Sequence, residues 1–177
     1  VAATDDPAQV GPVDLLVLGV KSYALEAALA TASPLLGPQT MVLPLQNGID
    51  ASGRVDACLG AGRAVAAVAY MSAVVAAPGI IRHHALNTVL LGETGAGPSP
   101  RVERTAAALS AAGFRCQTPA AIDVPLWEKF VMLAGTGGVM ALTRQTAGPI
   151  RSNPELSALF QGAQAEAAAV EIGRAHV

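Results

Sequence analysis

The first part of the chain alternates short runs of bulky aliphatic residues with segments of helical periodicity. Residues 13–20, 40–45 and 64–70 are apolar at nearly every position, which is typical of strands buried on both faces of a parallel sheet. Ser22 precedes a segment with apolar residues at helical spacing, and residues 51–60 separate the second and third strands. This rhythm of strand, helix, strand, helix and strand predicts right-handed parallel crossovers.

The middle of the chain continues the sheet. The pattern predicts two short strands over residues 79–84 and 88–92, joined by a turn at 85–87. A helix over 101–112 and a last strand over 114–118 follow.

The character of the chain changes after Pro119. Asp123 precedes a long apolar segment over 124–142, and Ser-Asn-Pro-Glu at 152–155 is a capping box that opens a second helix to the end. We therefore expect an α/β unit with a mixed sheet, followed from about residue 120 by helices.

Composition narrows the possible functions. Of the 177 residues 52% are hydrophobic and 14% charged, which excludes a disordered protein, and the net charge of −2 gives no electrostatic footprint for nucleic acid or anionic membranes. No apolar run reaches the roughly 18 residues that span a bilayer. The first residues carry acids where a signal peptide needs lysine or arginine, and the start without methionine resembles a cut. We expect a cytoplasmic protein with no nucleic-acid or membrane partner.

The sequence predicts no metal site and no disulfide. Cys58 and Cys116 have no CxxC spacing and no histidine nearby, so we expect both to be reduced and buried. His83 and His84 are adjacent, so on a strand they point to opposite faces and cannot share an ion. The glycine-rich residues 135–138 follow no strand, which favours a close helix contact over a phosphate cradle.

Lysine is rare in this chain, because nine of the eleven basic residues are arginines. A lysine can release its proton near neutral pH when its pKa is lowered, whereas arginine stays charged. Lys129 lies near the start of the predicted long helix beside Trp127, where the helix dipole and apolar neighbours both lower the pKa. Lys129 is therefore a candidate general acid. The alternatives are codon drift and a solvated lysine on the outer face of the helix.

The other lysine lies at a predicted sheet edge. Lys21 follows the first strand, Asn47 and Gly48 follow the second, and residues 71–73 follow the third. Ligands of open parallel sheets bind beyond the carboxyl ends of the strands, so this edge is a candidate cofactor shelf. Asn-Gly is also a favoured turn pair, so a purely structural role is the alternative.

Six motifs occur in order along the chain. They are Val-Lys-Ser-Tyr ending at residue 23, Leu-Pro-Leu-Gln-Asn-Gly at 48, Tyr-Met-Ser-Ala at 73, Pro-Gly-Ile-Ile-Arg-His at 83, Leu-Gly-Glu at 93 and Leu-Trp-Glu-Lys-Phe at 130. Together they resemble the 2-dehydropantoate 2-reductase (ketopantoate reductase) family over residues 3–170. The resemblance implies a Rossmann-like NADP-binding domain over residues 1–119, with its amino-terminal strands missing, and the start of a helical substrate and dimerisation domain over 120–170.

The resemblance also implies an activity and its residues. The family reduces ketopantoate to (R)-pantoate with NADPH, for pantothenate and coenzyme A biosynthesis. Lys21, Asn47 and Ala73 match its cofactor-binding positions, and Asn47 and Lys129 its substrate-binding positions. Lys129 matches the proton donor, so two lines of reasoning meet there. The implied partner is a small-molecule 2-oxo acid, and the intact protein is expected to form a homodimer.

The chain departs from the family pattern in several places. Leu133, Gly137 and Ala147 stand where the family has substrate-binding asparagines, which favours reduction of another 2-oxo acid as the alternative. The G-x-G-x-x-G unit and the carboxyl-terminal helices of the family are not in the sequence, so a further alternative is an inactive fragment. Residues 171–177 read as the translation of a sequencing-adapter oligonucleotide, and we interpret them as a non-native tail.

Overall fold

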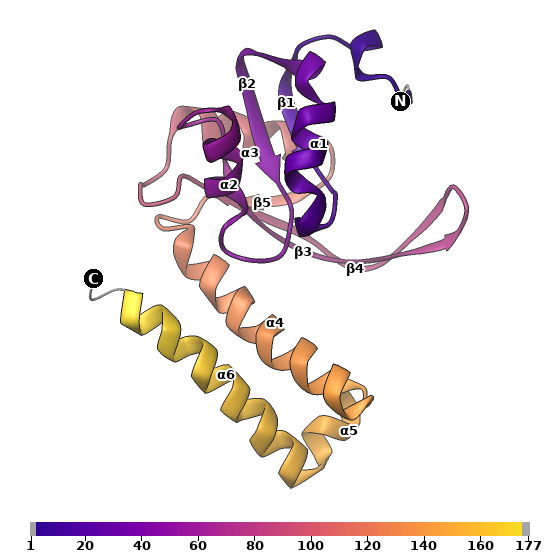
Figure 1. Cartoon of the computed structure of the whole chain (residues 1–177), viewed down its shortest axis with the longest axis vertical. Coiled ribbons are helices and arrows are strands. Elements are labelled where there is room, and N and C mark those ends of the chain that lie inside the picture. Colours follow the sequence, from indigo (N-terminus) through magenta and orange to yellow (C-terminus); the bar gives the residue numbers. More distant parts are fainter. Residues whose placement is uncertain (1–2, 175–177) are drawn as a thin grey trace. The chain divides into compact units, whose positions relative to one another are not determined.

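The computed structural model describes residues 3–174, with side chains through residue 170 (Figure 1). The chain divides into two compact units, Val1–Asp123 and Val124–Val177. In chain order the elements are η1 (Pro7–Gln9), β1 (Val13–Leu18), η2 (Ser22–Ala24), α1 (Leu25–Thr31), η3 (Ser33–Leu35), β2 (Leu36–Pro44), α2 (Ala51–Leu59), β3 (Ala66–Ala77), β4 (Ile80–Gly92), α3 (Pro100–Ala111), β5 (Arg115–Gln117), α4 (Asp123–Thr143), α5 (Ala147–Ser152) and α6 (Pro154–Arg174).

The first unit is an α/β unit with parallel and antiparallel strand pairs. β1 and β2 are parallel, as the apolar runs predict, and Val42 of β2 forms a parallel bridge to Ala64 just before β3. β3 then pairs antiparallel with β4, and β4 pairs parallel with β5. The predicted mixed α/β fold class is confirmed, and its first strands have the arrangement of a Rossmann-like domain.

β2 is covered on both faces. Neighbouring residues of β2 enter different cores, because successive side chains of a strand point to opposite faces. Val42 packs with the core that α1 and α2 contribute to, and Leu43 with the core of α3. The first core contains Leu18, Leu25, Leu29, Val42, Ala51, Val55 and Ala64. The second contains Leu43, Val65, Ala67, Val89, Leu91, Val102 and Ala106.

The predicted turn at residues 85–87 is wrong. Residues Ile80–Gly92 form one strand, and the hairpin turn lies at Gly79, whose φ of 74° favours glycine. Between the pairs Met71–Asn87 and Ser72–Ala85, Leu86 is an extra residue with a φ of 61°, which marks a β-bulge. The break in the apolar pattern at residues 85–87, which predicted a turn, is therefore a β-bulge within one continuous strand.

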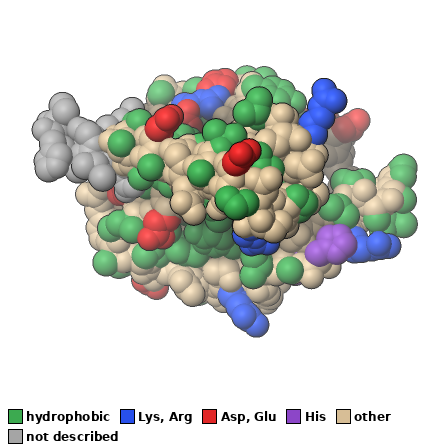
Figure 2. Space-filling model, turned by 90° about the horizontal axis from the view of Figure 1, so that it is seen from below, with side chains coloured by type: hydrophobic (Ala, Val, Ile, Leu, Met, Phe, Trp, Pro, Cys, Tyr) green, Lys and Arg blue, Asp and Glu red, His purple; other side chains and the backbone are tan. Residues whose placement is uncertain are grey.

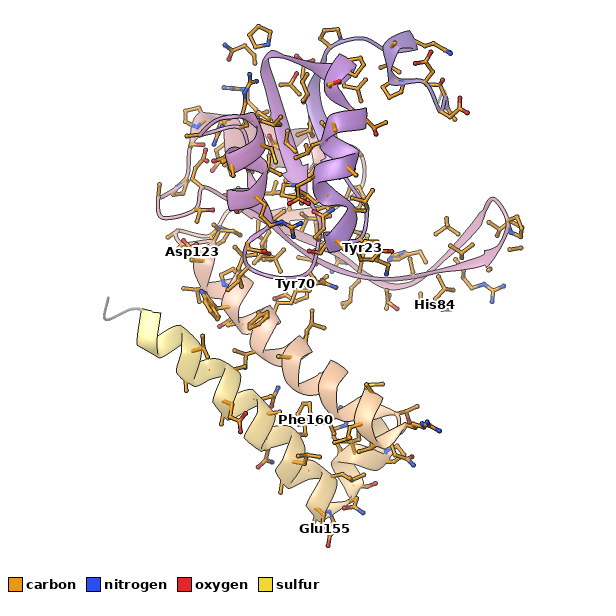
Figure 3. All side chains as sticks on the ribbon, in the orientation of Figure 1. Tyr23, Tyr70, His84, Asp123, Glu155 and Phe160 are labelled. Carbon is orange, nitrogen blue, oxygen red and sulfur yellow. The ribbon has the colours of Figure 1, made fainter. Side chains whose placement is uncertain are left out.

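The outer half of the β3–β4 hairpin projects from the first unit as a two-stranded ribbon (Figure 1). His84 lies along it (Figure 3), and hydrophobic side chains gather toward its tip (Figure 2). Val75 and Ile81 pair across the ribbon and are 71% and 65% exposed. Exposure of this apolar pair shows that the described unit does not cover the ribbon.

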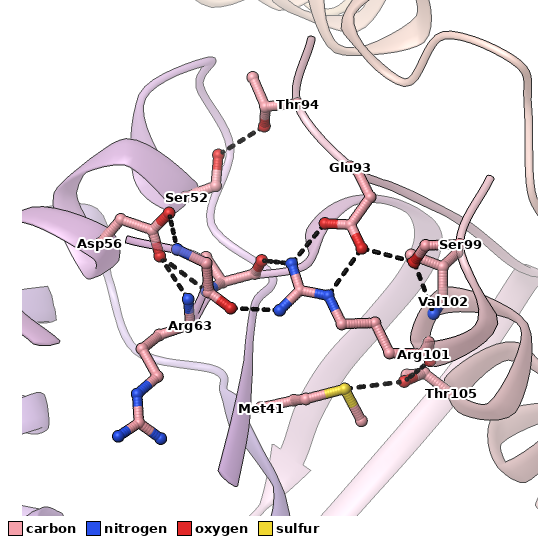
Figure 4. Close-up of polar contacts among 12 residues, drawn as sticks. Met41, Ser52, Asp56, Arg63, Glu93, Thr94, Ser99, Arg101, Val102 and Thr105 are labelled. Atoms are coloured by element: carbon pink, nitrogen blue, oxygen red, sulfur yellow. Dashed lines mark hydrogen bonds and ion pairs between the residues drawn. The ribbon is translucent and has the colours of Figure 1, made fainter. Parts of the chain in front are cut away.

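A charged network fixes the loops beside the second core (Figure 4). The Arg101 guanidinium pairs with the Glu93 carboxylate and donates to the backbone oxygen of Ala64. The hydrogen bond from Arg101 to the Glu93 carboxylate is the main cause that holds the pKa of Glu93 below its ordinary value. Asp56 accepts hydrogen bonds from the backbone of Gly62, Arg63 and Ala64 at 2.8–3.0 Å. The network therefore ties the start of α3 and the end of β4 to the loop that leads into β3.

The second unit is helical, as predicted. α4 and α6 contact each other at Gly135, where an added Cβ would lie 2.5 Å from Cγ of Gln164. This agrees with the predicted helix contact at residues 135–138. The sequence did not predict α5. α6 is capped by Asn153, whose Oδ1 accepts hydrogen bonds from the backbone of Glu155 and Leu156, one residue beyond the predicted cap at Ser152.

The predicted non-native tail lies only partly within the described residues. Residues 171–174 continue α6, and residues 175–177 lie outside the description. The interpretation of this tail stays a prediction.

Gly92 packs closely against Ile122, and a substitution at Gly92 tests this packing in the first unit. In Gly92→Ala the new Cβ would lie 2.5 Å from Cβ of the fully buried Ile122. We expect this overpacking to lower the free energy of unfolding by about 1–3 kcal/mol. The control Gly53→Ala has open space on α2 and should raise stability by roughly 0.5–1 kcal/mol. Urea unfolding measures both, and an unchanged midpoint for Gly92→Ala would contradict the packing.

Candidate functional site

Two predicted site residues lie at one edge of the first unit. β1 and β2 are parallel and end opposite each other at Leu18 and Pro44, so their carboxyl ends share an edge. Lys21 lies shortly after β1 and Asn47 shortly after β2, and both are exposed. The predicted edge therefore exists for these two residues.

Gln46 connects the two strand ends from inside. Its side chain is 8% exposed, and its Nε2 donates hydrogen bonds to the backbone oxygens of Leu18 at 3.1 Å and Val20 at 2.9 Å. The backbone nitrogen of Leu45 also donates to Leu18, at 3.0 Å. Because both partners of Nε2 are carbonyl oxygens, the orientation of the amide is fixed. Its Oε1 is buried and has no hydrogen-bond partner among the described residues.

Arg54 of α2 binds η2, the short 3-10 helix that directly follows Lys21. Its guanidinium donates to the hydroxyl and the backbone oxygen of Ser22, each at 2.8 Å. It also forms two hydrogen bonds to the carboxylate of Glu26, at 2.8 Å each, which hold the pKa of that carboxyl below its ordinary value. Ser22 directly follows Lys21, so α2 anchors the backbone beside this lysine.

The Asn-Gly pair does form a turn. Gly48 has a φ of 120°, which residues with a side chain rarely adopt, in the loop that leads from β2 to α2. This turn leaves the side chain of Asn47 exposed at the strand end. The turn alternative and the ligand-binding interpretation of Asn47 are therefore compatible.

The expectation for residues 71–73 is wrong in its position. These residues lie within β3, which runs to Ala77, and Ala73 pairs with His83 across the ribbon. The strand continues because the first strong turn signal after Tyr70 is Pro-Gly at 78–79. Ala73 therefore lies along the ribbon and not beyond a strand end.

Lys129 lies in α4 of the second unit and is partly buried. Burial lowers its pKa from the ordinary lysine value, because desolvation disfavours the ammonium form. The direction agrees with the sequence argument, which named desolvation by apolar neighbours as one of its two causes. Trp127 and Phe130 pack edge to face beside it, with ring centroids 5.6 Å apart.

The three positions at which the resemblance predicts substrate-binding asparagines are apolar or small. Leu133 lies one turn after Lys129 on α4 and Gly137 two turns after it, while Ala147 begins α5. No side-chain hydrogen bond to a substrate can come from these three residues.

Sequence reasoning missed Gln46 and Arg54 as parts of this site. A polar residue directly after the apolar run 41–45 was a usable signal for Gln46. Arg54 gave no local signal, because Ser22 and Glu26 lie 32 and 28 residues away in the chain.

A cavity of about 450 Å³ lies toward the opposite ends of the same strands. Its lining includes Asp14 of β1 and three arginines, Arg63, Arg101 and Arg104. Arg63 donates to backbone oxygens of the chain, and Arg101 is held by Glu93. Two of the three cations therefore have structural partners.

The described part of the chain contains no metal site, no disulfide and no membrane-spanning helix. None of its groups of His, Cys, Asp and Glu is arranged to hold a metal ion. Both cysteines are free thiols, but Cys58 is exposed on α2, so the prediction that both are buried is wrong. Val55 and Leu59, and not Cys58, pack against the core. Of the helices in residues 3–174, none is long and apolar enough to cross a membrane.

Comparison with known proteins places this geometry in a family. The family model described as "Ketopantoate reductase PanE/ApbA" matches residues 1–96, more than half of the chain. A 2-dehydropantoate 2-reductase of Mesorhizobium japonicum is 29% identical over 92% of this chain and 56% of its own length. One of Halobacterium salinarum is 30% identical over 84% of the chain and 49% of its own length.

A solved structure extends the likeness to three dimensions. The crystal structure of 2-dehydropantoate 2-reductase from Geobacter metallireducens GS-15 matches with a TM-score of 0.85 and 29% identity. The match covers 92% of this chain and 54% of that structure. The chain thus spans about half the length of the relatives it matches. From the matching family model, the shared fold and the six motifs, the chain belongs to the ketopantoate reductase family of oxidoreductases.

Proposed function

We propose that the protein containing this chain reduces 2-dehydropantoate to (R)-pantoate with NADPH. The observation that carries the proposal is Lys129, a partly buried lysine with a lowered pKa in a chain of this reductase family. The first unit would bind the cofactor and the second would contribute to substrate binding and dimerisation. Pantoate formation would place the enzyme in pantothenate biosynthesis.

The residues at the strand ends fit part of a phosphorylated dinucleotide. Lys21 offers an exposed cation for a phosphate, and Asn47 offers an exposed amide that can both donate and accept hydrogen bonds. Ala73 would contribute backbone groups from β3. No glycine-rich phosphate loop after a strand occurs among the described residues, so the pyrophosphate would need groups from elsewhere.

Lys129 would complete the reduction at the oxygen of the substrate. NADPH, when bound, supplies the hydride that adds to C2 of the 2-oxo acid. The ketone oxygen then carries negative charge, and the Nζ ammonium of Lys129 would stabilise that charge and transfer its proton to it. The net change is one hydride and one proton added to the ketone, which yields the 2-hydroxy acid. Asn47 would orient the substrate by hydrogen bonding.

A second candidate substrate follows from the α4 sequence. Leu133 and Gly137 cannot hydrogen-bond a polar substrate chain through their side chains. A more apolar or smaller 2-oxo acid would fit these residues better than the hydroxylated ketopantoate. NADPH oxidation against a panel of 2-oxo acids decides between them, and turnover of none would contradict the proposed reaction class.

The lowered pKa of Lys129 can be measured directly. The chain has only two lysines, so ¹³C-dimethylation gives two lysine signals, which Lys21→Arg assigns. We expect Lys129 to titrate below the ordinary value of about 10.4. The unfolded chain holds this proton more tightly, so the penalty on stability is present at neutral pH and fades as the pH rises toward that value. A midpoint at or above 10.4 would contradict the desolvation of Lys129.

Substitution of the two lysines separates proton transfer from cofactor binding. Lys129→Arg keeps the charge but removes the tunable donor, so kcat should fall about 10²- to 10⁴-fold with little change in the Kd for NADPH. The parent's kcat should decline as the pH rises through the lowered pKa of Lys129, and Lys129→Arg should lose this decline. The matched variant Lys21→Arg should weaken NADPH binding with a smaller effect on kcat. Near-parental turnover of Lys129→Arg from pH 6 to 9 would assign the proton to another group.

A further inference from the structure

We propose that Gln46 is a positioning residue that sets the separation of Lys21 and Asn47, and so the shape of the cofactor edge. The inference rests on the proposed NADPH-dependent function. Gln46 is buried, directly precedes Asn47, and reaches across to the end of β1.

The β1–β2 pair carries two buried polar side chains, Thr40 within β2 beside the amino end of β1 and Gln46 beyond the carboxyl end of β2. Thr40 is 3% exposed; its hydroxyl lies 2.5 Å from the backbone oxygen of Val13 and accepts a hydrogen bond from Gly37 at 2.8 Å. Its donor and acceptor capacities are therefore both used. At the carboxyl ends, Gln46 uses its donor group twice and leaves Oε1 without a partner among the described residues.

The unpartnered Oε1 argues against a role in stability alone. A buried acceptor without a hydrogen bond is destabilising by an amount similar to what a hydrogen bond contributes. The two bonds from Nε2 are therefore partly offset. In an apolar replacement the Leu18 oxygen keeps the hydrogen bond from the Leu45 nitrogen, and Val20 is 37% exposed, so its oxygen can bind water. An apolar side chain of similar length would therefore stabilise the fold nearly as well. What such a side chain would not provide is the fixed contact between Gln46 and the oxygens of Leu18 and Val20.

That contact controls the residues proposed to bind cofactor. Val20, whose backbone oxygen accepts a hydrogen bond from Gln46, directly precedes Lys21 in the sequence. Gln46 itself directly precedes Asn47. Arg54 holds Ser22 on the other side of Lys21. The backbone at Lys21 is thus fixed on both sides, by Gln46 through Val20 and by Arg54 through Ser22.

The test compares Gln46→Met with the control Thr40→Val in the full-length protein that contains this chain. We expect Gln46→Met to weaken NADP⁺ binding about tenfold by calorimetry, with little change in Tm and with kcat at saturating NADPH much less affected than KM for NADPH. Thr40→Val, which removes a hydroxyl that both donates and accepts beside the amino end of β1, should lower Tm and leave the Kd within about twofold. Parental affinity in Gln46→Met, or an equal loss in Thr40→Val, would overturn the inference.

Gln46→Glu adds a readout that a general packing role would not change. An ionised carboxylate cannot donate to Leu18 and Val20, but a protonated carboxyl can donate one hydrogen bond. Burial at this position would raise the pKa of the introduced carboxyl above the ordinary value of about 4.3. NADP⁺ binding by this variant should therefore recover as the pH falls from 8 to 5.5, relative to the parent, whereas Gln46→Met should show no such recovery. Absence of recovery in Gln46→Glu would contradict the donor role.

Hydrogen exchange separates failure of this inference from failure of the proposed function. The amides of Ala24 and Leu45, which donate to the backbone oxygens of Lys21 at 2.9 Å and Leu18 at 3.0 Å, should exchange about tenfold faster in Gln46→Met than in the parent, with or without cofactor. If the parent binds no NADP⁺, the proposed function fails and this exchange alone decides whether Gln46 holds the two loops. Unchanged exchange would show that it does not.

Discussion

The parallel pairing of β1 with β2 is the interaction on which the rest of the structure depends. It brings two loops from distant parts of the chain to one edge, and it exists because both strands are apolar enough to be covered on two faces. Alternate residues of β2 enter the two cores, so a shift of one residue in register would exchange the contents of both. The same pairing fixes which end of the strands can carry a ligand site.

Much of this arrangement could be predicted from the pattern of apolar residues. The runs at residues 13–20 and 40–45 became β1 and β2, and Lys21 and Asn47 lie beyond their ends as expected. The pattern failed where one local signal has two structural outcomes. The interruption around Leu86 predicted a turn but corresponds to a β-bulge, and the strand that holds Ala73 runs on into the hairpin.

The supporting residues were harder to predict, because their partners are remote in sequence. Gln46 hydrogen-bonds to residues more than 25 positions away, and Arg54 hydrogen-bonds to Ser22 of η2 and Glu26 of α1. Periodicity carries no information on such contacts. The lowered pKa of Lys129 was predictable in direction, because a lysine beside aromatic residues in an apolar helix is desolvated.

We propose that the carboxyl ends of β1 and β2 bind the dinucleotide. Titration of the ¹⁵N-labelled protein with NADP⁺ tests this binding site directly, because backbone amide shifts report where the ligand lies. We expect the largest shifts at residues 18–22 and 45–48. Shifts concentrated instead at Arg63, Arg101 and Arg104, which line the cavity toward the opposite strand ends, would contradict it.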